Sequence, residues 1–288
     1  MTSKPGNTVQ NSQTIIHSPA GIRLHGLGAW KWMIADLWRY RELLERMIHR
    51  ELAVRYRQSL LGYVWALILP LVSVSIFAFL AHSRILNIGA TSLPYVLFAL
   101  SNLCLWHLFS GILVASANSL SSAEPMIRRA GFPREILVLA AISRPIMELL
   151  IRLPLLILLF AGYGILPPLA ALWLPVLLLP LVALGTGLGL ILAATNLAIR
   201  DISQALTVFL SFAMFLAPVV YPIPVNPYMW LVYLNPVTPF LEMLQDMLST
   251  GMIEEPGHYI AACLFSFSVL LVAWRWFHLV IHRIIPLA

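Results

Sequence analysis

Six long apolar segments constrain the fold of this chain more than any other feature of its sequence. Each holds roughly the 20 apolar residues that an α-helix needs to cross the hydrocarbon core of a bilayer. The segments cover residues 60–81, 93–116, 133–160, 172–198, 202–220 and 259–280. Only 10% of the 288 residues are charged, against about 25% in soluble domains, because charged side chains are costly in hydrocarbon. The sequence therefore predicts an all-α integral membrane protein with six transmembrane helices.

Lysine and arginine predict how these helices are oriented. With six spans, 15 of the 18 lysine and arginine residues fall on the side of the N-terminus, and Arg84 alone falls on the opposite side. Short loops rich in lysine and arginine face the cytoplasm. Both termini are therefore expected in the cytoplasm.

The region before the first span has two parts. Residues 1–32 are mostly polar and are predicted to form a flexible cytoplasmic tail. From 33 to about 56, apolar residues recur at helical spacing with charged residues between them. This pattern predicts an N-terminal amphipathic interface helix that lies on the bilayer surface. A helix packed on a soluble partner would show the same pattern.

A charged island, EPMIRRAGFPRE at residues 124–135, separates the second and third spans. Glu124 suits a helix N-cap, Pro125 the first helical position and Gly131 the left-handed exit. These signals predict a short cytoplasmic helix shaped to fit into another protein. An ordinary polar loop, with arginines that only orient the spans, is the alternative.

Short helices are also predicted on the outer side, between spans five and six. Asn226-Pro227 and Asn235-Pro236 each match an N-cap followed by proline at the first helical position. Asp201 can cap the fifth span in the same way. Within the fourth span, the glycines at 185, 187 and 189 predict a surface for close helix packing rather than a phosphate cradle.

The third span carries three charged residues, Arg144, Glu148 and Arg152, at intervals of four. They share one face of a helix and are expected to pair or to face water. They could line a conduit, or form a self-neutralising structural cluster. Aromatic residues near the spans fit either a carbohydrate path or the membrane-interface belt. The conduit or gate candidates among them are Tyr63, Trp65, Trp106, Phe215 and Tyr221.

Several classes of active site find no support in the sequence. The only lysines are Lys4 and Lys31, which excludes a G-x-x-x-x-G-K-[ST] nucleotide-binding loop. The eight histidines are scattered without ligand spacing, and Cys104 and Cys263 both lie in apolar runs. No catalytic residue, metal site or cofactor is therefore predicted on this chain.

Four blocks of sequence, taken in order, resemble the permease subunits of ABC-2 type exporters for O-antigen, capsular polysaccharide or teichoic acid. These blocks are RELAVRYRQSLLGYVWALILPL from residue 50, PYVLFALSNLCLWHLFS from residue 94 with FPREIL from residue 132, AIRDISQAL from residue 198, and APVVYPIPV with LNPVTPFLE from residues 217 and 234. The family often has proline shortly after FPREIL and arginine in the helix after the NP motif. This chain has Val138 and Gln245 there.

The resemblance implies a single transmembrane domain over residues 33–288 that pairs with a second copy. Two separate ATP-binding cassette subunits, which carry the ATP and magnesium, would dock below it. The pair would enclose a channel for a lipid-linked glycan across the bacterial inner membrane, gated by the outer short helices. The coupling contacts would be Glu124, Pro125, Met126, Ile127, Arg128, Arg129 and Gly131. The interface helix would contact the ATPase through Arg39, Glu42, Arg46, Arg50, Arg55 and Arg57.

Three alternative functions remain open at this stage. An ABC-2 exporter of a small drug or lipid would have a narrow apolar path. A membrane-embedded glycan or lipid transferase would need clustered carboxylates or histidines at one membrane face. A passive scaffold would copurify with no ATPase.

Overall fold

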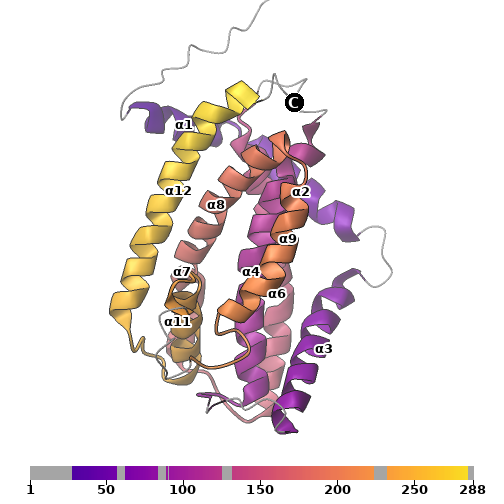
Figure 1. The fold of residues 1–288 in the computed structure, drawn as a ribbon, viewed down its shortest axis with the longest axis vertical. Coiled ribbons are helices and arrows are strands. Elements are labelled where there is room, and N and C mark those ends of the chain that lie inside the picture. Colours follow the sequence, from indigo (N-terminus) through magenta and orange to yellow (C-terminus); the bar gives the residue numbers. More distant parts are fainter. Residues whose placement is uncertain are drawn as a thin grey trace, which may run out of the picture.

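The computed structural model describes residues 28–56, 62–83, 89, 91–124, 132–223 and 232–284, and these residues form helices and connecting turns without a strand. The predicted all-α fold is therefore confirmed for the described residues (Figure 1). The helices are α1 Gly28–Arg39, α2 Arg41–Tyr56, α3 Gly62–His82, α4 Tyr95–Ser122, α6 Glu135–Gly162, η1 Leu169–Trp173, α7 Leu174–Leu177, α8 Leu179–Ala198, α9 Ile202–Ala213, η2 Met214–Leu216, α11 Thr238–Ser249 and α12 Pro256–Ile284.

Four helical stretches of the described residues are long and apolar enough to cross a bilayer. They are Tyr95–Ser122, Glu135–Gly162, Leu169–Ala198 and Pro256–Ile281. Two further apolar stretches, Pro70–Phe79 and Ile202–Leu216, are shorter. An integral membrane protein is consistent with these lengths, because about 20 apolar residues are needed to span the hydrocarbon core.

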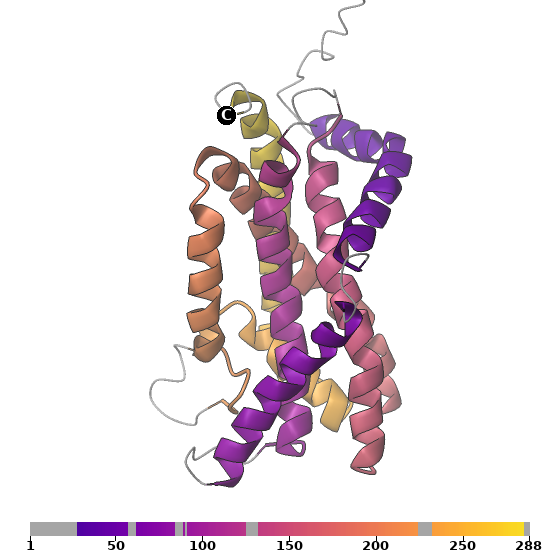
Figure 2. The same ribbon diagram turned by 90° about the vertical axis from the view of Figure 1, so that its right-hand side faces the viewer.

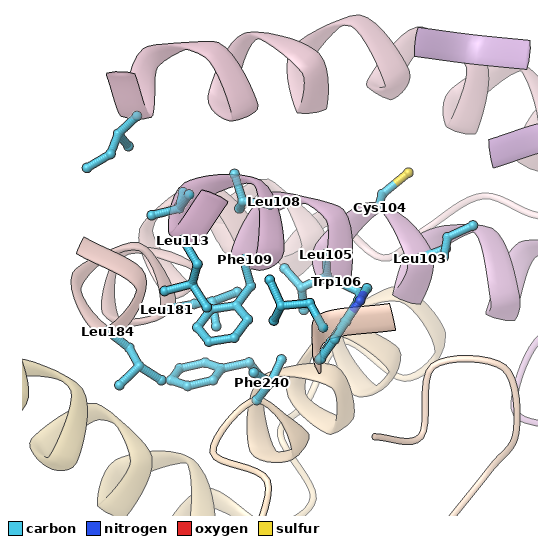
Figure 3. Packing of buried hydrophobic residues seen from close by; sticks show 14 of the residues in the cluster. Leu103, Cys104, Leu105, Trp106, Leu108, Phe109, Leu113, Leu181, Leu184 and Phe240 are labelled. Carbon is cyan, nitrogen blue, oxygen red and sulfur yellow. The ribbon is translucent and has the colours of Figure 1, made fainter. Parts of the chain in front are cut away.

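Helix α4 occupies the middle of the bundle. Of its apolar stretch 78% is buried inside the chain, against 17% for α6 and 22% for α12. Figure 2 shows α4 between α9 and α6. In the core, Trp106 and Phe109 of α4 lie among Leu181 of α8 and Phe240 of α11 (Figure 3). Helices α6 and α8 therefore pack on opposite parts of a largely buried α4, and α12 packs in turn on α8.

Helix α8 packs closely against two neighbours through its glycines, as the sequence predicts. A Cβ added at Gly189 would lie 2.6 Å from the Ser116 side chain of α4. A Cβ added at Gly187 would lie 2.8 Å from the Leu270 backbone of α12. Distances under 3 Å are too short for a carbon contact, so only glycine allows these backbones to approach so far.

The bundle has two ends, here named the basic end and the acidic end. The basic end carries α1, the end of α4, the start of α6, the turn between α8 and α9 and the end of α12 (Figure 1). The acidic end carries α11 and the turn before α12, with Glu242, Asp246, Glu254 and Glu255. The described connections between successive long helices thus lie at one end or the other of the bundle.

The single interface helix predicted over 33–56 is wrong in one respect, because the structure divides it into α1 and α2 at Tyr40. The two helices have different neighbours. Trp30 of α1 packs edge-on against Trp274 of α12 at 5.7 Å between ring centroids, whereas α2 packs along α6. A straight helix cannot reach both surfaces. Arg41, Glu42, Glu45, Arg46 and Arg50 of α2 are nevertheless exposed, as expected.

The predicted helix caps need correction. Asp201 is the residue before α9, but its side chain makes no capping hydrogen bond. The amide of Ser203 instead donates to Oδ1 of Asn196 at 3.0 Å. Because Asn196 is fixed by two other bonds, it already presents an acceptor at this point. Prediction of a helix cap from sequence considers only the residue directly before the helix, so an acceptor seven residues before Ser203 is missed.

Two other helix boundaries differ from the sequence prediction. The fifth span is predicted to reach residue 220, but the helix ends at Leu216. Ala217 is extended (φ −102°, ψ 149°) because it precedes Pro218. After Asn235, α11 begins only at Thr238, although the Asn235 side chain accepts a hydrogen bond from the Val237 amide. The region around Asn226-Pro227 lies outside the described residues.

Candidate functional site

Three helices meet at the basic end through one buried amide. Asn196, at the end of α8, is only 2% exposed. Its Nδ2 donates to the Ala117 carbonyl at 2.8 Å and to Oγ of Ser121 at 3.2 Å, both on α4. Its Oδ1 accepts from the Ser203 amide of α9. We name this set, Asn196 with Ala117, Ser121 and Ser203, the basic-end junction. The end of α4 and the start of α9 are therefore linked through a single side chain of α8.

The charged island adjoins this junction. Arg200, in the turn between α8 and α9, forms an ion pair with Glu124 at 3.4 Å. The Arg200 side chain is 80% exposed, so this pair contributes little to stability. Glu124 is the one predicted coupling residue that the structure describes. The others, Pro125, Met126, Ile127, Arg128, Arg129 and Gly131, lie outside the described residues.

A second link at the basic end joins α6 to α12. Glu135, the last residue of the charged island, begins α6 and is 6% exposed. Its Oε1 lies 2.9 Å from Nδ1 of His278 on α12. A buried carboxylate is costly unless it has a hydrogen-bond partner, and the imidazole provides one. Both helices that adjoin the island are thus fixed by polar side chains, α4 through Asn196 and α6 through Glu135.

The predicted charged contacts of the interface helix are placed only in part. Arg39, Glu42, Arg46 and Arg50 are exposed on α1 and α2. Trp38 is 71% exposed, and the Arg41 guanidinium stacks over its ring at 5.4 Å. Such a ring suits a headgroup interface. The side chains of Arg55 and Arg57 lie outside the described residues.

The charged stripe of α6 forms the ion pairs that its spacing predicts. Glu148 accepts from Nε of Arg144 at 3.4 Å and from the guanidinium of Arg152 at 3.5 Å. The exposed fraction of the side chain falls from 41% for Arg144 to 16% for Glu148 and 7% for Arg152. The stripe therefore begins at the surface of the chain and ends in its interior, so one carboxylate is shared by an accessible and a buried arginine.

The aromatic candidates lie in different environments. Trp106 is 3% exposed and packs against Phe109 with 6.1 Å between ring centroids, so within this chain it is a core residue. Phe215 is 52% exposed, and its carbonyl accepts from the Tyr221 hydroxyl at 2.8 Å. The side chains of Tyr63 and Trp65 lie outside the described residues. The candidates that are described thus share no single wall.

The acidic end contains a cavity of about 180 Å³ that the sequence did not predict. Burial first, and then the neighbouring Asp246 and Glu255 carboxylates, raise the pKa of Glu242. Burial also raises the pKa of Asp246. Gln245 of α11 reaches α4, where its Nε2 donates to Oδ1 of Asn102 at 2.7 Å. An asparagine within an apolar span is unusual, and this was the one signal for the site.

A metal ion has no prepared site in the described part of the chain, since no group of three or more His, Cys, Asp or Glu side chains is arranged to hold one. The arrangement instead combines a membrane-length bundle, a polar junction next to an exposed charged island, and a polar cavity at the opposite end. The length of the apolar helices is that of a multi-pass membrane protein.

Comparison with known proteins identifies the family. Residues 42–248 match the ABC-2 type transporter family, and the chain belongs to it, which confirms the resemblance read from the sequence blocks. The chain is 24% identical over 238 residues to the O-antigen export system permease protein RfbA of Klebsiella pneumoniae, covering 80% of this chain and 88% of the relative. It is 27% identical over 191 residues to a protein of the same name from Myxococcus xanthus, covering 66% and 72%. The polysialic acid transport protein KpsM of Escherichia coli is 22% identical over 219 residues, covering 74% and 83%.

Proposed function

We propose that this chain is the permease subunit of an ATP-driven exporter that moves a lipid-linked polysaccharide across a bacterial inner membrane. The observation that carries the proposal is the match to the ABC-2 type transporter family. The relatives are named for O-antigen export and polysialic acid transport, and their alignments cover most of this chain and most of each relative. The sequence has no nucleotide-binding loop. ATP and magnesium would therefore bind to a separate ATP-binding cassette subunit.

The proposed topology has six spans, with the basic end in the cytoplasm. Helices α3 and α9 would supply the two spans beyond the four long ones. Helix α3 has 21 residues and is about 31 Å long at 1.5 Å per residue, which matches a hydrocarbon core of about 30 Å. Helix α9 is shorter, and residues 217–223 would complete its crossing.

The proposed coupling runs through the basic-end junction. The partner ATPase would close on ATP and push the island at residues 124–131. Glu124 is paired with Arg200, and Asn196 joins the end of α4 to the start of α9. The exposed charged residues of α1 and α2 would form the rest of the contact. A displacement of the island would therefore tilt α9.

A second copy of the chain would cover α3 and α9. The outward face of α9 carries Gln204, Thr207 and Ser211 as well as Phe209 and Phe212, all of them exposed. Polar side chains are unfavourable against lipid, whereas small hydroxyl residues suit close helix packing. We therefore place the dimer seam and the glycan channel on this side.

ATP-coupled export by the chain with its ATPase in proteoliposomes tests the function. Glu124→Ala is expected to lower export severalfold with normal membrane insertion. Asp201→Ala is the matched control, because Asp201 lies in the adjacent turn and makes no capping bond. Equal export by both variants would contradict the coupling path. Export without any ATPase would contradict the function itself.

Cysteine crosslinking tests the dimer seam. In a chain without Cys104 and Cys263, Ser211→Cys on α9 is expected to crosslink to its counterpart. Ser268→Cys on α12 is the control, because both serines are exposed and bond the carbonyl four residues earlier. Crosslinking at position 268 but not at 211 would place the seam on the wrong helix.

A further inference from the structure

We propose that the cavity at the acidic end binds an uncharged, hydroxyl-bearing sugar unit of the exported glycan and disfavours acidic sugars. The proposal rests on the proposed function, since it names the kind of glycan that this chain would pass. The residues that carry it are Glu242, Gln245, Asp246, Glu254 and Glu255, with Asn102 of α4.

Hydrogen bonds fix which way the Gln245 amide points. Asn102 donates its Nδ2 to the Pro218 carbonyl at 3.1 Å, so its Oδ1 must accept. Nε2 of Gln245 donates to that Oδ1 and to Oγ of Ser101 at 2.9 Å. The Gln245 carbonyl oxygen is therefore held on the other side of the amide. Rotating the amide would place its oxygen against another oxygen.

Two buried oxygens, on two of the residues that line this cavity, lack a hydrogen-bond donor within the described part of the chain. Gln245 is 8% exposed, and its Oε1 has no partner among the described residues. The Oε2 of Glu242 also has none, although its Oε1 accepts from the Tyr233 hydroxyl at 2.8 Å. An unmade bond to a buried acceptor is costly. Both oxygens therefore call for a ligand that donates hydrogen bonds.

The charge of the cavity selects among such ligands. Four carboxylates, from Glu242, Asp246, Glu254 and Glu255, line it, and no lysine, arginine or histidine is among the lining residues that the structure describes. The pKa of Glu242 is raised first by burial and that of Asp246 likewise, and His258 lies near Glu242. A sugar carboxylate would meet like charge here, whereas a sugar hydroxyl would donate to an acceptor.

Size and shape favour a sugar ring over an ion. The cavity volume of about 180 Å³ is the volume that about six molecules of liquid water occupy, at ~30 Å³ each. Phe98, Leu241 and Pro222 give the cavity an apolar side, against which the C–H face of a ring can pack. The carboxylates are not arranged as a metal site in the described part of the chain.

The test measures the binding of two probes of equal length to the full complex in nanodiscs without ATP. Maltotetraose is the neutral probe and tetragalacturonate is the acidic one. Saturation-transfer NMR reports their relative affinity. Maltotetraose is expected to bind more tightly. The triple variant Asp246→Asn, Glu254→Gln, Glu255→Gln should improve tetragalacturonate binding by about fivefold for each neutralised charge within about 4 Å of it in water.

Gln245→Leu tests the orphaned carbonyl directly. Loss of one buried hydrogen bond should weaken maltotetraose binding by about tenfold, whereas Ser268→Leu on α12, which does not line the cavity, should leave it unchanged. The triple variant leaves Gln245 and its hydrogen bonds to α4 unchanged, so it decides the matter if Gln245→Leu does not fold. Equal binding of both probes, no response to neutralisation, no binding of either probe, or a requirement for calcium would each overturn the proposal. Because no ATP is used, the outcome is separate from the export assay.

Discussion

Replacing Gly187 by alanine gives the sharpest test of the packing in this bundle. The added Cβ would lie 2.8 Å from Cα of Leu270 and 2.9 Å from its amide nitrogen. Both atoms belong to the α12 backbone, so no side-chain rotation can relieve the contact. The backbones of α8 and α12 must therefore move apart at this contact. Inserting one methyl group into a packed core costs about 1–3 kcal/mol, and we expect the upper part of this range because the neighbour is backbone.

The assay can use a cysteine that the chain already contains. Cys104 is buried at 4% exposure, so a thiol-reactive fluorophore reports its exposure as the purified chain unfolds on heating in detergent. The unfolding midpoint of Gly187→Ala is expected to fall by several degrees.

Gly162→Ala is the matched control for this measurement. Gly162 ends α6, and a Cβ there meets nothing within 4 Å. Alanine is favoured over glycine in a helix by up to about 1 kcal/mol, so this midpoint should stay constant or rise. A midpoint of Gly187→Ala at or above that of the unchanged chain would refute the packing argument.

Three further perturbations follow from the polar contacts. Asn196→Leu removes the three hydrogen bonds of the basic-end junction and should cost about 1–3 kcal/mol, measured as a lower unfolding midpoint, and it should also reduce ATP-coupled export. Glu148→Gln removes the carboxylate beside the buried Arg152 and should lower the midpoint more than Arg144→Ala does, because Arg144 is far more exposed; equal effects would contradict the gradient of burial. The raised pKa of Glu242 means that the folded chain holds this proton more tightly than the unfolded chain. Stability should therefore fall as the pH rises from the ordinary glutamate value through the raised one, and Glu242→Gln should reduce this dependence in a pH series of unfolding midpoints.

Features that depend on neighbouring residues could be predicted from the sequence. Helical fold, the family and the close-packing role of Gly187 and Gly189 are confirmed, because apolar run length and small-residue spacing are local properties. The count of six spans stays a prediction, since four stretches reach full length among the described residues. The end of the fifth span before Pro218 could have been read from the residue before proline.

Contacts between distant residues could not be predicted in this way. Asn196 meets Ala117 across 79 positions, and Gln245 meets Asn102 across 143. No spacing rule connects such pairs, so Asp201 was expected to cap α9 and the cavity at the acidic end was missed. The break at Tyr40 has the same origin, because α1 and α2 bend toward different partners that lie far along the chain. An asparagine inside an apolar segment is the usable signal for such contacts.

The hydrogen bonds at the two extremities of α9 have a consequence for how this sequence can vary. Asn102 and Ala117 on α4 are 15 positions apart, as are their counterparts Ser203 and Pro218 on the α9 segment. The α9 segment is therefore tied to α4 near both of its ends, directly through Asn102 at one end and through Asn196 of α8 at the other. Deleting one residue from a helix shifts everything beyond it by about 1.5 Å and rotates it by about 100°. The hydrogen bonds at one end of α9 would then be broken. Natural variants should tolerate substitutions along either segment, but should gain or lose single residues only when both segments change together.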